Sequence, residues 1–307
     1  AIIPSSEDGA GPPEDDAGLA SDVLAPAGPL AYSPCSISER VGGFEITLAE
    51  DYTGVNGQVA NGVVPGNVPE VVADAGDCAL LQASALFCDP PCVPGETCGA
   101  DGACIPYPEN QTVGPVTVEG LKSPLVMEAK WGNYYTNPGT MEHPGYETGA
   151  ELTLSAEGGD LQPFAARGLG VSPLQVTGGT VSVEDQEDVL VTWIPGEDQE
   201  AVRVHLELNI NNHGTTSAWI ACDVDDTGSA LIPADLVSGL YAIGVSGFPS
   251  LEAERRSVES AQLSVGCVEF EVVSPASVPV EVGGVVSCTS DVQCPPGQSC
   301  GVDLQCQ

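Results

Sequence analysis

Short runs in which apolar and polar residues alternate fill the chain from residue 111 to residue 280. Alternation with a period of two places one face of a strand in a core and the other in solvent, so each run predicts a β-strand. The eight runs are VGPVTVEG, AELTLSAEGG, GTVSVEDQ, DVLVTWIPG, AVRVHLELNI, SAWIACDV, LYAIGVSGF and CVEFEVVS. Gly, Pro, Asn and Asp separate them, as is typical of an Ig-like or jelly-roll-like β-sandwich. Residues 111–280 are therefore predicted to form one sandwich.

One segment inside this region has helical spacing. In IPADLVSGL, Leu236 and Leu240 lie four positions apart, which predicts a short helix or 3₁₀ turn. The strands around it supply the predicted core, whose members are large apolar residues at alternating positions: Trp193, Val202, Val204, Leu206, Leu208 and Phe270.

Two segments precede the predicted sandwich. Residues 35–87 contain one clear alternating run, GGFEITLAEDY, followed by a stretch rich in Gly, Asn and Pro, so they predict a small β element with turns and edge strands. Residues 1–34 are rich in Pro, Gly, Ala, Ser and acid and have no sustained period, which predicts an extended arm. The arm is either a passive stalk or an extended segment that docks on a neighbouring subunit, through Ala1, Ile2 and Ile3 or through Leu24 and Leu30.

An internal repeat is the most specific pattern in the chain. The segment from Cys88 reads CDPPCVPGETCGADGAC, the segment from Cys288 reads CTSDVQCPPGQSCGVDLQC, and both contain C-x-P-G-x-[ST]-C-G-x-D-x-x-C. Residues 88–110 and 281–307 are therefore predicted to be two cysteine-rich modules with two disulfides each. Of the three possible connectivities we favour first to third and second to fourth, because adjacent pairing would leave two unlinked loops.

The even number of cysteines predicts six disulfides formed in an oxidising compartment, so the protein is expected to be secreted or on the cell surface. A zinc site is disfavoured because the sequence contains no CxxC pair. Outside the modules we expect Cys35 to pair with Cys78, and Cys222 with Cys267. The twelve positions are Cys35, Cys78, Cys88, Cys92, Cys98, Cys104, Cys222, Cys267, Cys288, Cys294, Cys300 and Cys306.

Charge excludes several classes of partner. With 44 acidic and 7 basic residues the formal net charge is -37. Nucleic acids and anionic membranes are disfavoured, since both need clustered Lys and Arg. Such a surface suits a salty or calcium-containing exterior, where cations relieve self-repulsion. The chain opens at Ala1 without a signal-peptide pattern, which we interpret as a mature form, and no apolar run predicts a transmembrane segment.

Five phrases of the sequence carry a resemblance: TWIPG, LNINNHGTT, CDVDDTGSALIPADLV, GVSGFPS and GCVEF. They resemble a family of uncharacterised exported proteins and lipoproteins of myxobacteria and related bacteria. The similarity runs from about Cys35 to the end and includes both modules. It implies export and a β-sandwich with small cysteine-rich modules, without an assigned activity. The chain departs from the lipoproteins by beginning with Ala1 rather than a lipidated cysteine.

No catalytic motif is found. His143, His205 and His213 lack metal-ligand spacing, and GVSGF around Ser246 is the nearest fragment to a nucleophile elbow but is set between predicted strands. The protein is therefore expected not to be an enzyme and to need no cofactor, with calcium as the one candidate ion.

The calcium hypothesis rests on Asp223, Asp225 and Asp226 in CDVDDTGS, where three carboxylates and a glycine turn could surround a hard cation. The EF-hand pattern is not met, since Thr227 takes the fifth place and Ala234 the twelfth. The alternative is a plain turn with its acids in water.

The sequence predicts one of two functions. One is a structural or surface protein that assembles with copies of itself through the arm. The other is a calcium-assisted binding module for a polymer or another exported protein.

Overall fold

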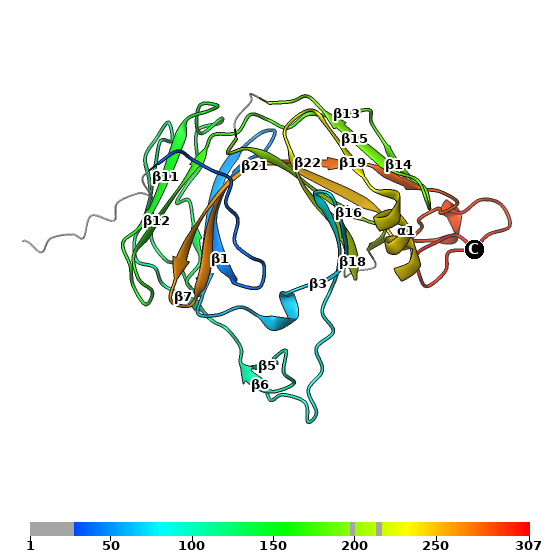
Figure 1. Ribbon diagram of the computed structural model, residues 1–307, viewed down its shortest axis with the longest axis horizontal. Coiled ribbons are helices and arrows are strands. Elements are labelled where there is room, and N and C mark those ends of the chain that lie inside the picture. Colours follow the sequence, from blue (N-terminus) through cyan, green and yellow to red (C-terminus); the bar gives the residue numbers. More distant parts are fainter. Residues whose placement is uncertain (1–27, 197–199, 213–216) are drawn as a thin grey trace, which may run out of the picture.

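The computed structural model describes residues 28–196, 200–212 and 217–307. Within them the chain is mainly β, with one α-helix, α1 (Ala234–Ile243), and two 3₁₀ helices, η1 (Pro65–Asn67) and η2 (Asp291–Gln293) (Figure 1). The predicted mainly-β fold is confirmed. The predicted short helix is confirmed too, but it extends through Ile243 into the run LYAIGVSGF, of which only β20 (Ser246–Gly247) is a strand.

A ten-stranded sheet runs through the whole molecule. Its order is β10 (Tyr135–Thr136), β2 (Thr53–Ala60), β1 (Arg40–Leu48), β22 (Gly266–Val278), β21 (Ser250–Leu263), β16 (Arg203–Asn209), β18 (Ala218–Asp225), β4 (Cys78–Gln82) and β3 (Glu70–Ala75), with β7 (Asn110–Gln111) also paired to β2. Figure 1 shows this sheet bending around the middle of the molecule, with β1 on one side and β16, β18 and β3 on the other.

The first half of the sheet packs on a second sheet of four strands. These are β12 (Phe164–Leu169), β11 (Glu151–Ala156), β8 (Val116–Glu119) and β9 (Leu125–Met127). Alternating residues of both sheets meet in one hydrophobic core, which includes Phe44, Ile46, Leu152, Leu154 and Phe270. This packing covers the outer, convex face of the sheet, as Figure 1 shows for β11 and β12.

The second half of the ten-stranded sheet has its own hydrophobic core and is covered by further strands and a helix. The cover consists of β13 (Val176–Thr177), β15 (Val189–Trp193) and β19 (Ser229–Ile232), the parallel pair β14 (Val181–Val183) and β23 (Val280–Val282), and α1. The core includes Trp193, Leu206, Leu208, Ile220 and Leu240. The hairpin of β21 and β22, paired from Leu251↔Val278 to Leu263↔Gly266, contributes to both cores.

The predicted single sandwich over 111–280 is thus two packed halves that share one sheet, and residues 35–87 are not a separate element. Strand β1 pairs in parallel with β22, and β4 pairs with β18. All six predicted core residues are buried, with Val202 and Phe270 in the first core and Trp193, Val204, Leu206 and Leu208 in the second.

All twelve cysteines are paired. The modules have the expected connectivity, Cys88–Cys98 with Cys92–Cys104 and Cys288–Cys300 with Cys294–Cys306. The other two predicted pairs are wrong, because the disulfides are Cys35–Cys267 and Cys78–Cys222. The reason is the sheet order: Cys78 and Cys222 lie directly opposite each other on β4 and β18, and Cys267 pairs with Arg40, near Cys35, at the start of the β1–β22 ladder.

The modules lie at different places on the molecule. The first contains the hairpin of β5 (Glu96–Cys98) and β6 (Cys104–Pro106). The second lies beside α1 at the C-terminus (Figure 1), where its Asp303 carbonyl accepts a hydrogen bond from Gly247 of β20, the parallel partner of β17 (Asn211–Asn212).

Only the last part of the predicted arm belongs to the described residues, and it is fixed to its own chain. The Ser33 amide donates to the Val258 carbonyl, and Arg167 donates to the Gly28 carbonyl. Leu30 is half-buried there, whereas Ala1, Ile2, Ile3 and Leu24 lie outside the described residues. Within the described residues, no helix has the length and hydrophobicity needed to cross a bilayer.

Candidate ligand-binding groove

Strand alternation gives the ten-stranded sheet a polar face opposite its two cores. On β1, Phe44, Ile46 and Leu48 enter the first core, so Gly43, Glu45 and Thr47 point to the other side. A hollow of about 680 Å³ lies on this concave face. Its lining residues are Pro34, Cys35, Ile37, Arg40, Glu45, Asn67, Pro69, Leu81, His205, Glu207, Trp219, Ala221, Asp223, Glu252, Glu254, Arg256, Glu269 and Glu271.

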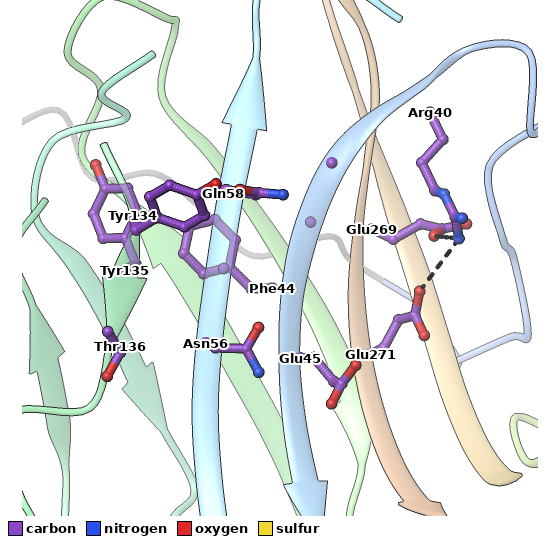
Figure 2. A pocket seen from close by; sticks show the side chains of 13 residues that line it. Arg40, Phe44, Glu45, Asn56, Gln58, Tyr134, Tyr135, Thr136, Glu269 and Glu271 are labelled. Carbon is purple, nitrogen blue, oxygen red and sulfur yellow. Dashed lines mark hydrogen bonds and ion pairs between the residues drawn. The ribbon is translucent and has the colours of Figure 1, made fainter. Parts of the chain in front are cut away.

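A second pocket of about 420 Å³ opens beside this hollow and shares Arg40, Glu45, Glu269 and Glu271 with it. Figure 2 shows it from close by. Its further lining residues come from β1, β2 and the start of β10: Gly42, Gly43, Phe44, Asn56, Gly57, Gln58, Tyr134, Tyr135 and Thr136. We call the first the main hollow, the second the flanking pocket, and the two together the concave groove.

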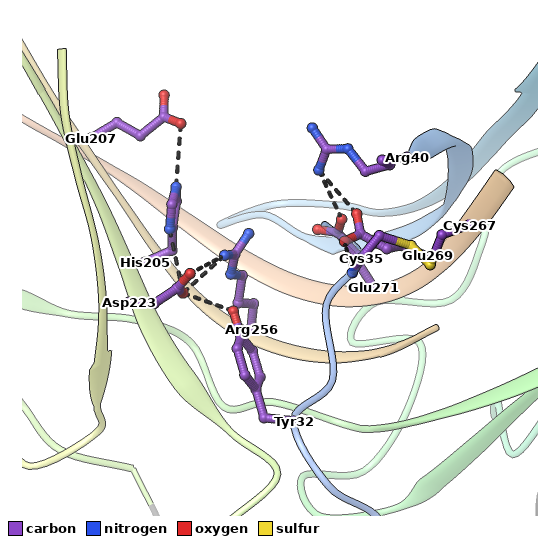
Figure 3. A network of polar contacts seen from close by, with 10 residues as sticks. All are labelled: Tyr32, Cys35, Arg40, His205, Glu207, Asp223, Arg256, Cys267, Glu269 and Glu271. Carbon is purple, nitrogen blue, oxygen red and sulfur yellow. Dashed lines mark hydrogen bonds and ion pairs between the residues drawn. A yellow bond between two sulfur atoms is a disulfide. The ribbon is translucent and has the colours of Figure 1, made fainter. Parts of the chain in front are cut away.

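A polar network crosses the centre of the groove (Figure 3). Nη2 of Arg256 donates to both carboxylate oxygens of Asp223 at 2.8 Å, and the Tyr32 hydroxyl donates to Oδ1 at 2.7 Å. His205 lies between Asp223, 3.4 Å from its Nδ1, and Glu207, 3.2 Å from its Nε2. The network therefore joins β16, β18 and β21 to the segment before β1.

The network sets the charge state of its members. Burial alone would raise the pKa of Asp223, but the hydrogen bond from His205 and the charge of Arg256 outweigh it and hold that pKa well below its usual range. Burial would lower the pKa of His205, but its hydrogen bonds to Asp223 and Glu207 raise it to about 9. His205 is thus a cation at neutral pH, which does not suit a general base.

A second ion pair lies at the start of β1. Nη1 of Arg40 is 2.9 Å from Oε2 of Glu269 and 3.9 Å from Oε1 of Glu271, and the Cys35 amide donates to Glu269 at 2.7 Å. Burial and the neighbouring Glu269 raise the pKa of Glu271 to about 8. Figure 3 shows these groups beside the Cys35–Cys267 disulfide.

The groove also contains two pairs of carboxylates at directly opposed positions. Glu45 on β1 is the partner of Glu271 on β22, and Glu207 on β16 is the partner of Glu252 on β21. Like charges placed opposite each other destabilise a sheet. The chain has seven basic residues, of which Arg40 and Arg256 line the hollow. The groove therefore keeps an excess of negative charge.

The structure does not bring together the three carboxylates of the calcium hypothesis. Asp223 belongs to the network above, and Asp225 pairs with Nη2 of Arg203 at 2.6 Å. Asp226 is buried and accepts from the Trp193 indole, the Gly196 amide and Arg255. In the described part of the chain, only disulfide-bonded cysteines place three or more candidate ligand atoms within 4.8 Å of one another.

The other candidate residues are dispersed. His143 contacts Thr53 and the Glu50 carbonyl and does not line the groove, and His213 lies outside the described residues. Ser246 lies in the short strand β20, paired with Asn211. The groove could not be predicted from the sequence. Its lining residues are the polar positions of alternating strands that point away from the core, and in a sequence such positions look like ordinary solvent-facing ones.

No protein-family model matches the chain, and no curated protein matches it. Among solved structures, the chicken CNTN1 FN1-FN3 domains match with 11% identity over 75% of this chain and 72% of theirs, at a TM-score of 0.18. An adhesin that helps an Antarctic bacterium bind ice matches with 14% identity over 83% of this chain and 79% of that one, at a TM-score of 0.17.

Proposed function

We propose that this chain is a non-catalytic extracellular binding protein that holds its ligand in the concave groove. The observation that carries the proposal is the groove itself, because strands β1, β4, β16, β18, β21 and β22 all contribute side chains to one hollow of about 680 Å³. A hollow of this size with a few convergent polar groups is the usual form of a ligand site.

The side chains of the groove are held in place before any ligand arrives. Arg256, Asp223 and His205 fix one another, and Arg40 and the Cys35 amide fix Glu269. Preorganised side chains lower the entropy lost on binding. Trp219, Leu81 and Ile37 add apolar surface to the same hollow. The groove thus combines ordered polar groups with apolar walls.

An extracellular location agrees with the covalent structure. Six disulfides link all twelve cysteines, and such bonds persist in oxidising compartments. The excess of carboxylates in the groove disfavours phosphorylated, sulfated or nucleic-acid ligands. A neutral or cationic ligand is therefore expected.

The proposal is tested by filling the groove. Ala221 lies between Trp219 and Asp223 in the main hollow, and Asn56 lies in the flanking pocket. Binding of defined glycans and peptides is measured for wild type, Ala221→Phe and Asn56→Phe. Ala73→Phe, on the exposed edge strand β3 outside the groove, is the matched control.

We expect at least one probe to bind wild type and the control equally, and to lose about tenfold or more in affinity with one of the filled variants. Equal binding by all four proteins, or binding to no probe, would contradict the proposal. Circular dichroism and thermal midpoints confirm that each variant is folded.

Self-association is a second candidate function, favoured by one observation. Leu190 and Leu231 lie directly opposite each other on β15 and β19, on the outer side of the three-stranded sheet, and are 58% and 54% exposed. Exposed apolar surface of this kind favours contact with another copy of the chain. Light scattering of wild type and Leu231→Asp tests it, with loss of an oligomer in the variant as the expected result.

A further inference from the structure

We propose that the flanking pocket of the concave groove is a carbohydrate subsite that takes a neutral, hydroxyl-rich oligosaccharide, its ring stacked on Tyr134 and its hydroxyls bound by side chains of β1, β2 and β22. This inference rests on the proposed binding function and names the ligand class.

Strand register arranges the pocket as two rows of side chains. In the first row Gln58, Gly43 and Glu269 are neighbours on β2, β1 and β22. In the second row Asn56, Glu45 and Glu271 are neighbours on the same strands. Thr136 of β10 pairs with Asn56 and extends the second row.

The pocket is hollow because Gly43 has no side chain at the middle of the first row. A Cβ atom there would lie 2.5 Å from the Glu269 carbonyl oxygen, so no other residue fits without displacing the backbone. The gap lies between an amide on one side and a carboxylate on the other, as Figure 2 shows for Gln58 and Glu269. Four neighbouring strands span roughly 14 Å, at about 4.8 Å per spacing, which is the length of a short oligosaccharide.

Tyr134 supplies an aromatic surface at one end of the rows. Its side chain is 49% exposed although it lines the pocket. A tight turn supports it from behind, where a Cβ atom on Gly132 would lie 3.4 Å from its ring, and where its carbonyl accepts a hydrogen bond from Lys130. A half-exposed ring fixed beside hydrogen-bonding groups can stack on the C–H face of a sugar.

The polar groups match hydroxyls better than a charged or peptide ligand. Amides both donate and accept, and carboxylates accept, which is the mixture that sugar hydroxyls need. Asn110 donates to Oε1 of Gln58, which fixes the orientation of that amide. An anionic sugar would be repelled by Glu45 and Glu269, whereas Glu271, whose pKa is raised to about 8, can also donate a hydrogen bond at neutral pH.

The flanking pocket offers a peptide few groups to bind. The main-chain groups of β1 are already paired with β2 on one side and β22 on the other, so no strand can be added at this face. The pocket also offers only one exposed ring, whereas peptide and protein interfaces depend on clustered apolar anchors.

The experiment is isothermal titration of the intact, oxidised protein with defined probes. Neutral hexasaccharides of glucose, mannose, galactose and N-acetylglucosamine are compared with heparin hexasaccharide and hexalysine. Tyr134→Ala and Asn56→Ala test the subsite. Tyr52→Ala, which removes a tyrosine of similar exposure (55%) outside the pocket lining, is the matched control.

We expect at least one neutral hexasaccharide to bind wild type, to lose about tenfold or more with Tyr134→Ala and with Asn56→Ala, and to change less than about twofold with Tyr52→Ala. Binding of hexalysine alone, lost in Ala221→Phe, would overturn the carbohydrate inference and leave the binding function standing. Binding of no neutral hexasaccharide, or equal binding by Tyr134→Ala and Tyr52→Ala, would overturn it as well.

Discussion

Arg256 on β21 and Asp223 on β18 form an ion pair that reaches across the strand between them, with Nη2 2.8 Å from both carboxylate oxygens. The strand that they bridge is β16, whose His205 contacts the same carboxylate. One acidic side chain therefore holds three strands and the Tyr32 hydroxyl together. Because the groove wall depends on these contacts, its rigidity should respond to pH.

His205 gives the first prediction. Its pKa rises from 6.5 to about 9 in the folded protein, so its contribution to stability is fully present below about pH 6.5 and is lost as pH rises through 9. We expect His205→Gln to lower the thermal midpoint at pH 6 more than at pH 9.5. Scanning calorimetry at both values measures this, and an equal loss at both would show that His205 is not charged in the fold.

Substitution of Glu271 is predicted to raise the stability of the protein at high pH, the opposite of the effect expected for His205. Its pKa rises from 4.5 to about 8, so the folded form binds the proton more tightly, and the wild type loses stability as pH rises from about 4.5 to 8. Glu271→Gln removes this loss. We expect the variant to be more stable than wild type at pH 9, on the order of a few kcal/mol, and similar at pH 4.

The control for this experiment is Glu119→Gln at the end of β8, outside the groove lining. It should leave the pH profile of the thermal midpoint unchanged. A Glu271→Gln variant that is less stable than wild type at pH 9 would mean that the Arg40 contact outweighs the repulsion from Glu269.

Substitutions of Asp225 and Asp226 distinguish a calcium site from the ion pairs that these residues form in the structure. Asp225 is 73% exposed, so Asp225→Asn should cost about 0 to 1 kcal/mol. Asp226 is 6% exposed against Arg255 at 2%, so Asp226→Asn leaves a buried cation and should cost about 3 to 5 kcal/mol. Urea unfolding in calcium-free buffer measures both.

Calcium should not restore the stability of the Asp226→Asn variant, because the missing carboxylate bound Arg255, Trp193 and the Gly196 amide rather than a cation. A calcium-dependent gain in the wild type that Asp225→Asn abolishes would instead support the cation site.

Much of the fold was predictable because its determinants are local. Alternation predicted the strands, and the buried residues Val204, Leu206 and Leu208 follow from it. The repeated cysteine spacing was enough for the module disulfides, since each closes a loop within one repeat.

The rest depends on contacts between distant segments. The parallel ladder of Phe44 with Phe270 joins the first strand to the last long one, and no local pattern encodes that pairing. The same ladder explains why Cys35 pairs with Cys267 rather than Cys78. It also explains the groove, because Glu45 and Glu271 are unremarkable polar positions until the sheet places them together.

The disulfides should differ in what they stabilise. Cys35–Cys267 closes a loop over a sequence separation of 232 and fixes the segment that covers the groove, whereas Cys92–Cys104 spans 12 within the first module. We expect the Cys35→Ser, Cys267→Ser double variant to lose about 2 to 5 kcal/mol from the main transition. The Cys92→Ser, Cys104→Ser variant should leave that transition almost unchanged. Equal effects on the main transition would show that the module is part of the same cooperative unit.

The segment before β1 gives the last prediction, because it contains the residue that covers the polar network. The centroid of the Tyr32 ring lies 5.7 Å from the guanidinium carbons of both Arg203 and Arg256, and the Tyr32 hydroxyl donates to Asp223. Removing only the hydroxyl in Tyr32→Phe should cost about 0.5 to 1.5 kcal/mol.

Tyr32→Ala also removes the ring that both guanidinium groups contact, so it should cost more, by about 0.5 to 2 kcal/mol. Deletion of residues 1–27 retains Tyr32 and Ser33 and should therefore cost less than deletion of residues 1–34, which should match or exceed the loss in Tyr32→Ala. Urea unfolding compares the four proteins, and light scattering of the two deletions shows whether the arm also joins subunits. If the shorter deletion is as destabilising as the longer one, the contacts of Tyr32 and Ser33 are not what fixes this segment to the groove.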